Sequence, residues 1–377
     1  MQHNFHACSR IIQVKLAQLL RGLINGEMAY TGPFYANVDL DLDCNISCIG
    51  CPYRSSKQIG ANAGDHALRY ISLDLVKRLA AEFQELGVPE VILVGQGEPL
   101  LHPEFAEIIS IFKHAGLKVQ LYTNGTLLNE AGARSILDSG LDILVISLWA
   151  NNLEEYERCY PGVNPKNFKK TIEGVKVLSE LKKERGLKLP AVILAQPINH
   201  YNYKGIDARI YLAHSLGCDG VRFACFYSKR GEFSEAVLSN DEINIVLKGL
   251  VESRSRVKKI SLTHNLDNVL LRYRMGERVW RRLPCYVGWF STSIKVDGTV
   301  APCCRCSMPL GNLYESSFRE IWNGPPYRCF RREGLGVKDP ASLTQRCECD
   351  WCPTAGDNFR VHQIFKWFTP FLGSTSK

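Results

Sequence analysis

The sequence predicts an α/β protein: a partial (β/α)6, TIM-like barrel followed by a small cysteine-rich domain. Three observations support this fold class. From residue 36 to about residue 230, short apolar segments alternate with segments whose apolar residues recur at helical spacing. The short segments are mostly apolar, as the strands of a parallel sheet are. Past Arg254 the alternation stops, and eight of the fifteen cysteines fall between residues 285 and 352.

The first half of the barrel has three predicted strands, VDLDL, VILV and KVQLYT. After the first, Ser72 caps a helix that Gly87 ends, and one face of it carries Leu75, Leu79, Phe83 and Leu86. After the second, Pro103 stands at a helix start and Gly116 follows its end. Its apolar positions are Phe105, Ile108, Ile109 and Phe112.

The second half repeats the pattern. Its strands are DILVISL, AVILAQ and GVRFACF. A helix with apolar residues at Phe168, Ile172, Val175, Leu178 and Leu181 follows the first of them, and IDARIYLAHSLG follows the second. Six strands, each followed by a helix or a loop, make most of a barrel.

Four unusual loops follow the first four strands. They are CNISCIGC, GQGEPLL, TNGTLL and SLWANN. Because the carboxyl ends of parallel barrel strands meet on one rim, and barrel chemistry sits there, we expect these loops to form one site.

Composition and charge argue against two classes of protein, nucleic-acid-binding proteins and membrane-spanning proteins. The net charge of +8 is spread over helices, which argues against nucleic-acid binding. Arg10, Lys15 and Arg21 interrupt the apolar N-terminal segment, and no stretch approaches the length of a membrane span. We therefore expect a cytoplasmic protein without a transmembrane segment. The amphipathic first helix and the aromatic, basic tail could touch a membrane surface, but packing on the main domain is favoured for both.

The predicted organisation has five parts. TSIKVDGTVAPCC is predicted to be a hairpin that turns at Asp-Gly, inside a metal-stapled module. The parts are an N-terminal helix (1–35), the barrel core (36–230), a bridging region (231–284), the cysteine-rich module (285–355) and a C-terminal helix or tail (356–377).

Cys44, Cys48 and Cys51 lie on one tight loop, spaced by three residues and then by two. A structural zinc site is closed by four ligands. Three thiolates can instead hold three irons of a 4Fe-4S cluster and leave the fourth iron open to a small molecule. The alternatives are a zinc site completed by a distant residue such as His66, or three thiols without a metal.

This loop resembles the signature of the radical S-adenosylmethionine (SAM) enzymes, Cys-x3-Cys-x2-Cys after the first strand of a partial barrel. The resemblance covers about residues 36–226. It implies that Cys44, Cys48 and Cys51 bind the cluster and that SAM chelates the open iron through its amino and carboxylate groups. The sequence departs from the family at Gly50, where an aromatic residue is usual.

The resemblance also implies SAM contacts on the other loops. Gln96, Gly97 and Glu98 stand where the family has a Gly-Gly-Glu stretch that meets the SAM amino group, and glycine there permits close approach of the backbone. Asn124 and Ser147 match positions that touch the SAM ribose and carboxylate. Arg158 is a further candidate for SAM. Taken alone, each of these segments would be an ordinary turn or strand end.

The C-terminal cysteines resemble the SPASM or twitch module of radical SAM enzymes. Cys285, Gly298 and Cys303 fit its opening Cys-x(9–15)-Gly-x4-Cys, and LGNLYESSFREIW resembles the stretch that follows. The resemblance implies one auxiliary 4Fe-4S cluster bound by Cys285, Cys303, Cys349 and Cys352. A second cluster is not expected, because the Cys-x2-Cys-x5-Cys-x3-Cys block is missing. The remaining thiols are expected to be reduced or, with zinc in the module, ligands: Cys304, Cys306, Cys329 and Cys347.

The activity that the resemblance implies begins with an electron from flavodoxin or ferredoxin. SAM is then cleaved, and a 5'-deoxyadenosyl radical abstracts hydrogen from a substrate. The auxiliary cluster would assist net oxidation or crosslinking. A small molecule, sugar or lipid-linked substrate is favoured over a peptide, and no catalytic side chain is assigned. Alternatives are a peptide-modifying maturase of the RiPP or sulfatase type, a radical SAM methyltransferase and a non-enzymatic zinc-binding scaffold.

Overall fold

The computed structural model describes residues 3–51, 69–226, 228, 233–275, 283–306, 308–336, 347 and 354–371, with side chains from residue 14 onward except at residues 275, 355 and 369–371. His66, Cys349 and Cys352, which the sequence analysis singled out, lie outside the described residues.

The strands of the described part form one sheet of ten, in the order β10-β9-β8-β1-β2-β3-β4-β5-β6-β7. Strands β1 to β6 follow one another in sequence and are parallel. Their bounds are β1 Tyr35–Asp39, β2 Glu90–Val94, β3 Lys118–Thr123, β4 Ile143–Ser147, β5 Ala191–Ile198, β6 Gly220–Cys225, β7 Thr263–His264, β8 Ser291–Ile294, β9 Thr299–Ala301 and β10 Gly311–Asn312.

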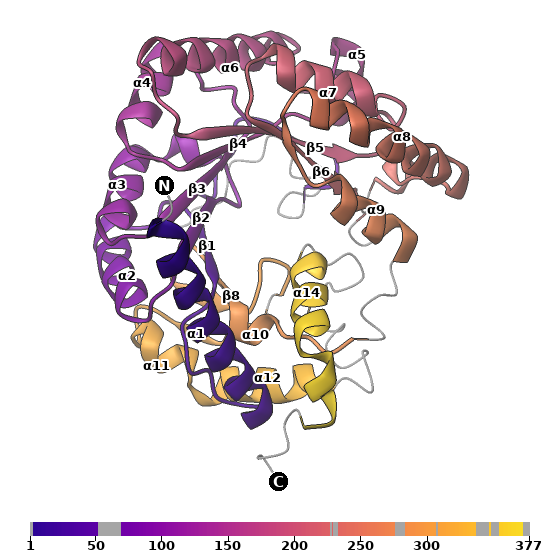
Figure 1. The fold of residues 1–377 in the computed structure, drawn as a ribbon. Helices are drawn as coiled ribbons and strands as arrows, with labels where there is room; N and C mark the ends of the chain where they lie inside the picture. Colours follow the sequence, from indigo (N-terminus) through magenta and orange to yellow (C-terminus); the bar gives the residue numbers. More distant parts are fainter. Residues whose placement is uncertain are drawn as a thin grey trace.

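Helices α2, α3, α4, α6 and α7 lie along the outside of the curved sheet, whereas α9 and α14 lie on its open side, as Figure 1 shows. The helices of the described chain are α1 His3–Asn25, α2 Leu73–Glu85, α3 Phe105–His114, α4 Glu130–Asp138, α5 Leu153–Cys159, α6 Lys166–Glu184, α7 Ile206–Ser215, α8 Asn240–Lys259, α9 Leu266–Met275, α10 Val287–Phe290, α11 Phe318–Trp322, α12 Pro325–Leu335 and α14 Ala355–Phe365, with 3-10 helices η2 Pro99–Leu101, η3 Ser234–Ala236 and η5 Lys366–Phe371. The predicted partial barrel is confirmed.

The residues predicted to begin and end helix α2 have the expected roles in the structure. The Ser72 hydroxyl accepts a hydrogen bond from the backbone N–H of Leu75, which satisfies one of the donors left open at a helix start. Gly87 follows the helix with a φ of +65°, a conformation that glycine adopts without steric cost. The apolar face between them is buried.

The two faces of the barrel sheet differ in packing. Tyr122, Ser147 and Arg222 lie on the inner face and are half-buried, because the barrel is open there. The opposite face packs beneath the helices and is almost fully buried, as its register-matched residues show: Leu121, Leu144, Ile146, Leu194 and Val221. The inner face therefore leaves room for a site.

The C-terminal module continues the barrel sheet, which the sequence did not predict. Strand β8 pairs in parallel with β1, and β8 and β9 form the predicted antiparallel hairpin. The hairpin turns at Asp297 and Gly298, whose φ is +78°. The Lys295 ammonium lies 3.0 Å from the buried Asp39 carboxylate of β1 and adds an ion pair between the two parts.

Arg331 of α12 fastens this module to the N-terminal segment. Its fully buried guanidinium donates hydrogen bonds to the backbone oxygens of Gly288, Glu27 and Trp322 and to the Asn323 side chain. It also lies 4.6–5.8 Å from the centres of three aromatic rings, those of Trp289, Trp322 and Tyr327. One side chain thus joins three segments that are distant in sequence, those around Glu27, Gly288 and Arg331 itself.

We expect Arg331→Ala to lower the free energy of unfolding by more than about 3 kcal/mol, because several buried carbonyl oxygens lose their donor at once. Thermal or urea unfolding measures the loss. The neighbouring Arg332 forms an exposed ion pair with Glu27, and Arg332→Ala should leave the stability close to wild type. Equal effects of the two changes would contradict this account.

The C-terminal helix α14 packs on the start of the module. The Asn358 side chain accepts a hydrogen bond from the Tyr286 N–H and donates one to the Pro284 oxygen. The same helix also contacts the barrel, where the Tyr35 hydroxyl of β1 donates a hydrogen bond to the Asp357 carboxylate. None of the helices in the described part of the chain is both long and apolar enough to cross a membrane.

Candidate active site

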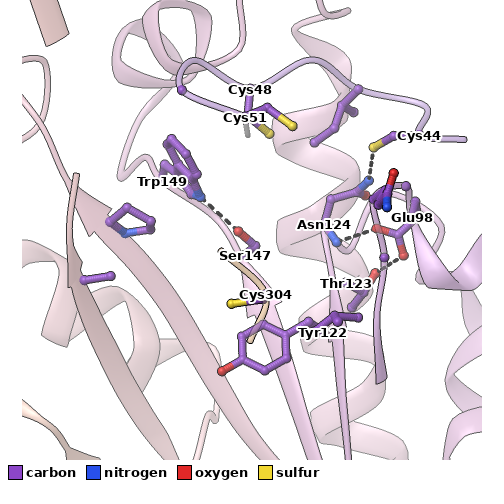
Figure 2. Close-up of a pocket in the computed structure, with 18 of the residues that line it drawn as sticks. Cys44, Cys48, Cys51, Glu98, Tyr122, Thr123, Asn124, Ser147, Trp149 and Cys304 are labelled. Atoms are coloured by element: carbon purple, nitrogen blue, oxygen red, sulfur yellow. Dashed lines mark hydrogen bonds between the residues drawn. The ribbon is translucent and has the colours of Figure 1, made fainter. Parts of the chain in front are cut away.

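The four predicted loops enclose a cavity of about 430 Å³ at the carboxyl ends of the barrel strands. Cys44, Cys48 and Cys51 line it, and so do the second, third and fourth loops through Gln96, Gly97, Glu98, Asn124 and Ser147. Figure 2 shows the cysteine loop on one side of this space and Ser147 and Asn124 facing it. The loop positions were therefore predicted from the strand pattern alone.

The cysteine loop is held by its neighbours. The Ile49 N–H donates to the Cys159 carbonyl of α5, and the Cys51 N–H donates to the Cys48 carbonyl. The Asn124 amide lies 3.8 Å from the Cys44 sulfur as a donor. Gly50 has a φ of +62°, which favours glycine at this position. This backbone requirement gives a physical reason for the departure noted at Gly50.

The second loop interlocks with the cysteine loop. The Gly97 N–H donates to the Asp41 carbonyl at 2.8 Å, and the Glu98 N–H donates to the Asp43 carbonyl at 2.6 Å. A Cβ atom at Gly97 would lie 1.8 Å from the Asp43 carbonyl oxygen, far inside van der Waals contact. The close approach that requires glycine is therefore to the cysteine loop itself.

Glu98 is buried and joins the second and third loops. Its carboxylate accepts hydrogen bonds from the Thr123 hydroxyl and from the backbone N–H groups of Asn124 and Leu100. Burial raises the pKa of Glu98 to about 7, although these hydrogen bonds favour the ionised form. Glu98 is thus a structural link as well as a lining residue.

We expect the raised pKa of Glu98 to appear in the pH dependence of stability. Between its ordinary pKa of 4.5 and about 7, the folded protein binds more protons at Glu98 than the unfolded chain does, so stability falls as pH rises through this window. The contribution is about 3 kcal/mol. The stability of wild type relative to the non-titrating Glu98→Gln should therefore fall as pH rises from about pH 5 to about pH 8, as unfolding midpoints measure. Parallel pH profiles would contradict the assignment.

The Gln96 side chain is held by the buried carboxylate of Asp39. Asp39 of β1 forms a hydrogen bond with the Gln96 side chain and the ion pair with Lys295 of the C-terminal module. Desolvation raises the pKa of Asp39, and Lys295 opposes this rise. The second loop is therefore connected to the C-terminal module through two side chains.

Ser147 and Trp149 form the fourth side of the cavity. The Trp149 indole N–H donates to the Ser147 hydroxyl oxygen at 2.9 Å, as Figure 2 shows. Arg158, a predicted SAM contact, does not line this cavity. It lies on the surface of α5, pairs with Glu154 and contacts the Tyr201 ring.

Sequence reasoning missed several lining residues. Trp149 and Phe226 supply aromatic surface, and Arg272, Cys304 and Arg305 reach the cavity from outside the barrel core. Trp149 could have been found, since it follows Ser147 in the fourth loop. Nothing in the sequence near Arg272 or Arg305 signals this placement, because it depends on how α9 and the loop after β9 fold back onto the barrel.

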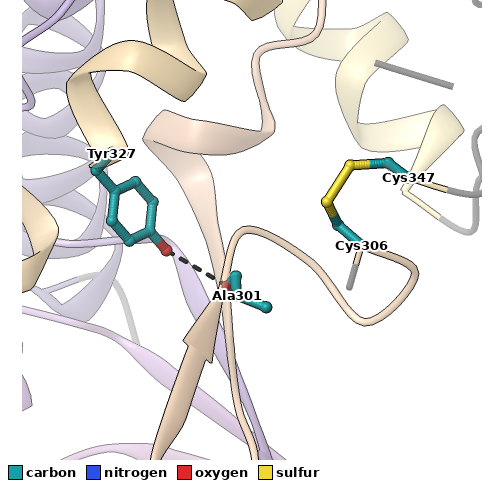
Figure 3. The surroundings of a disulfide bond; sticks show 4 residues. All are labelled: Ala301, Cys306, Tyr327 and Cys347. Carbon is teal, nitrogen blue, oxygen red and sulfur yellow. Dashed lines mark hydrogen bonds between the residues drawn. A yellow bond between two sulfur atoms is a disulfide. The ribbon is translucent and has the colours of Figure 1, made fainter. Parts of the chain in front are cut away.

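The auxiliary-cluster cysteines are described only in part. Cys285 precedes α10 and Cys303 follows β9, so both lie near the same end of the β8–β9 hairpin. Cys306 and Cys347 form a disulfide, shown in Figure 3, so the expectation that both are reduced thiols is wrong in this structure. Cys304 lines the cavity instead, and Cys329 lies on α12 beside Glu333.

Comparison with known proteins decides the family. Residues 42–194 match the radical SAM superfamily, and residues 285–353 match SPASM, an iron–sulfur cluster-binding domain. The chain belongs to the radical SAM superfamily and carries a SPASM domain. The predicted family is thereby confirmed, and with it the cofactors that these domains use: SAM, a 4Fe-4S cluster and auxiliary iron–sulfur clusters.

The radical SAM relatives of this chain have names that describe different activities. The AdoMet-dependent heme synthase of Methanosarcina barkeri is 27% identical, over 82% of this chain and 86% of that protein. The PqqA peptide cyclase of Granulibacter bethesdensis is 25% identical, over 80% and 77%. Streptococcus suis SuiB bound to S-adenosylmethionine has a TM-score of 0.65 at 14% identity, over 93% of this chain and 78% of SuiB. At that identity the likeness to SuiB shows the fold alone.

The residues present fit a radical SAM cluster. Three thiols line one cavity with polar groups from the three adjacent loops. Burial, and then the neighbouring thiols, raise the pKa of Cys48, so thiolates there call for a metal-borne positive charge. No group of three or more ligands within the described ranges could hold a single metal ion. In a 4Fe-4S cluster each cysteine binds a different iron.

Proposed function

We propose that this radical SAM protein reductively cleaves SAM and uses the resulting 5'-deoxyadenosyl radical to abstract hydrogen from a substrate. One observation carries the proposal: the three signature thiols share a cavity with Gln96, Gly97, Glu98, Asn124 and Ser147. These are the loops on which the family resemblance places the SAM contacts. A single cavity can thus hold both the cluster and SAM.

The chain's own residues would hold and orient the two groups. Cys44, Cys48 and Cys51 would bind three irons, which leaves the fourth open to SAM. The backbone of Gln96 and Gly97 would meet the SAM amino group, and Ser147 and Asn124 would meet its carboxylate and ribose. When bound, the reduced cluster supplies the electron that cleaves SAM. Trp149 and Phe226 would cover the site with apolar surface and exclude water.

We propose one auxiliary 4Fe-4S cluster, with Cys285, Cys303, Cys349 and Cys352 as ligands. The disulfide supports this set, because it joins Cys347 to the loop that begins at Cys303. Cys347 precedes the proposed ligand Cys349 by two residues in the sequence. The cluster would accept an electron from the substrate radical, giving net oxidation or crosslinking, and flavodoxin or ferredoxin would supply the first electron.

A peptide-modifying maturase is the second candidate. Two comparisons favour it: the PqqA peptide cyclase is a relative over most of the chain, and SuiB, which shares the fold, is also known bound to its precursor peptide SuiA. The heme synthase relative favours a small-molecule substrate instead. Both candidate functions require the same cleavage of SAM. They differ in whether the substrate that enters the cavity is a peptide or a small molecule.

Anaerobic incubation with SAM and dithionite tests the proposal. We expect 5'-deoxyadenosine and methionine as products, and about seven to eight irons per chain from two 4Fe-4S clusters. Zinc without iron would favour the scaffold alternative. Transfer of the SAM methyl group without 5'-deoxyadenosine would favour a methyltransferase. An intact cluster that yields neither product with a competent electron donor would overturn the proposal.

A further inference from the structure

Trp149 is held in the fourth loop by a hydrogen bond at each of its polar groups. Its backbone N–H donates to the Tyr160 hydroxyl at 3.0 Å, and its backbone oxygen accepts from the Asn202 side chain at 2.9 Å. Its indole N–H donates to the Ser147 hydroxyl oxygen at 2.9 Å, the bond drawn in Figure 2. The ring therefore cannot turn without breaking its bond to Ser147.

The two partners of the Trp149 backbone are buried and fixed in turn. Tyr160, which follows α5, is 1% exposed, and its hydroxyl also donates to the Ser147 carbonyl oxygen at 3.3 Å. Asn202, between β5 and α7, is 2% exposed and also donates to the Pro197 carbonyl oxygen at 2.9 Å. Trp149 is thus held by two segments that lie outside its own loop.

A buried ion pair supports the same loop. The fully buried Arg209 of α7 lies 3.2 Å from the Glu155 carboxylate of α5 and donates to the Asn202 backbone oxygen at 3.0 Å. The Glu155 carboxylate also accepts from the Asn151 N–H at 2.8 Å. The loop after β4 is therefore anchored at Trp149 and again at Asn151. The fold itself sets the position of the indole before any ligand binds.

The bond from Trp149 decides how the Ser147 hydroxyl can be used. A serine hydroxyl has one proton to donate and two lone pairs that accept. The indole N–H occupies one lone pair of Ser147, and none of the described residues accepts its proton. The Thr123 hydroxyl on the third loop differs, because it donates to Glu98. Ser147 therefore keeps a donor for a molecule bound in the cavity that it lines.

We propose that Trp149 is a positioning residue for SAM, whose indole N–H orients the Ser147 hydroxyl so that Ser147 donates to the SAM carboxylate. The inference rests on the proposed function and adds to it a residue that sequence reasoning missed. A carboxylate only accepts hydrogen bonds, whereas a ribose hydroxyl can donate or accept, so an oriented donor suits the carboxylate better. A hydrogen bond to a charged acceptor is also stronger than one to a neutral acceptor.

Anaerobic binding of SAM to the oxidised holoenzyme tests the inference without turnover. The two ligands are SAM and decarboxylated SAM, which differ only in the carboxylate. Trp149→Phe keeps an aromatic ring and removes the indole N–H. We expect this change to raise the Kd for SAM about tenfold and to leave the Kd for decarboxylated SAM unchanged.

A double variant tests whether Trp149 acts through Ser147. Ser147→Ala removes the donor itself and should raise the Kd for SAM at least as much as Trp149→Phe does. Combining the two changes should weaken SAM binding no further than Ser147→Ala alone, because the indole then has no hydroxyl to orient. A purely structural role of Trp149 would not produce this coupling.

Trp322→Phe is the matched control. The Trp322 indole N–H donates to the Thr31 carbonyl oxygen at 2.9 Å, the same length as the bond from Trp149, but Trp322 does not line the cavity. This variant should keep the wild-type Kd for both ligands, even where its unfolding midpoint falls.

A second variant covers failure of Trp149→Phe to fold with its iron. Tyr160→Phe keeps the indole and removes the hydroxyl that holds the Trp149 backbone. It should reduce the preference for SAM over decarboxylated SAM. A Tyr160→Phe protein with full iron and an unchanged preference would count against the inference.

Three further results would overturn the inference. Trp149→Phe could bind SAM as tightly as wild type, or it could weaken SAM and decarboxylated SAM equally, which would assign Trp149 to packing alone. The effects of Trp149→Phe and Ser147→Ala could also add in the double variant. Normal SAM binding without cleavage on reduction by dithionite would instead count against the proposed function and leave the role of Trp149 standing.

Discussion

Cys48→Ala will abolish 5'-deoxyadenosine formation and lower the iron content of the anaerobically prepared protein to about four per chain, that of one auxiliary cluster. Cys48 is the central cysteine of the loop, and burial raises the pKa of its thiol. Without it, two thiols remain for three irons. Product analysis and iron determination on the same preparation measure both effects.

Cys159→Ala is the matched control. Cys159 is a buried thiol beside the same loop, but it hydrogen-bonds to Asn199 and does not line the cavity. Its backbone carbonyl, which holds Ile49, is unaffected by the change. The variant should keep its iron and its SAM cleavage. If Cys48→Ala retained activity, or if both variants lost it equally, the cluster would not be where we propose.

Gly97→Ala will separate the second loop from the cysteine loop. The added Cβ would lie 1.8 Å from the Asp43 carbonyl oxygen, and backbone must move to relieve the clash. We expect a loss of more than about 3 kcal/mol in the free energy of unfolding, together with loss of the radical SAM cluster. Thermal unfolding and iron content report the two effects.

Gly249→Ala provides the comparison. Gly249 lies inside α8, where a Cβ would meet the Ile206 side chain at 3.3 Å. Alanine has the higher helix propensity, by about 1 kcal/mol, so this variant should be as stable as wild type or more stable. A mild effect at Gly97 would mean that the two loops are not locked together as the structure shows.

The barrel and its rim could be predicted because they depend on patterns between residues that are close together in the sequence. Period-two and helical spacing located six strands and the helices between them, and the caps at Ser72 and Gly87 act as expected. Parallel topology then brought Cys48, Glu98, Asn124 and Ser147 to one edge without any knowledge of their contacts.

Features that depend on long-range packing could not be predicted. The pairing of β8 with β1 joins segments about 250 residues apart, as do the contacts of Lys295 with Asp39. The same folding back brings Arg305 into the cavity and Cys306 against Cys347. The need for glycine at Gly97 was predicted for a ligand, whereas the nearest group is a protein carbonyl. No local pattern carries that information.

The pairing of β8 with β1 also constrains how such a chain could be shortened. A fragment ending before Ser291 would strip β1 of one neighbour and expose a row of backbone amides and carbonyls. Uncovered strand borders of this kind invite self-association. The same cut would remove Lys295, Cys304 and Arg305. Evolutionary exchange of the SPASM domain would therefore have to supply both a replacement strand and a new wall for the reaction chamber.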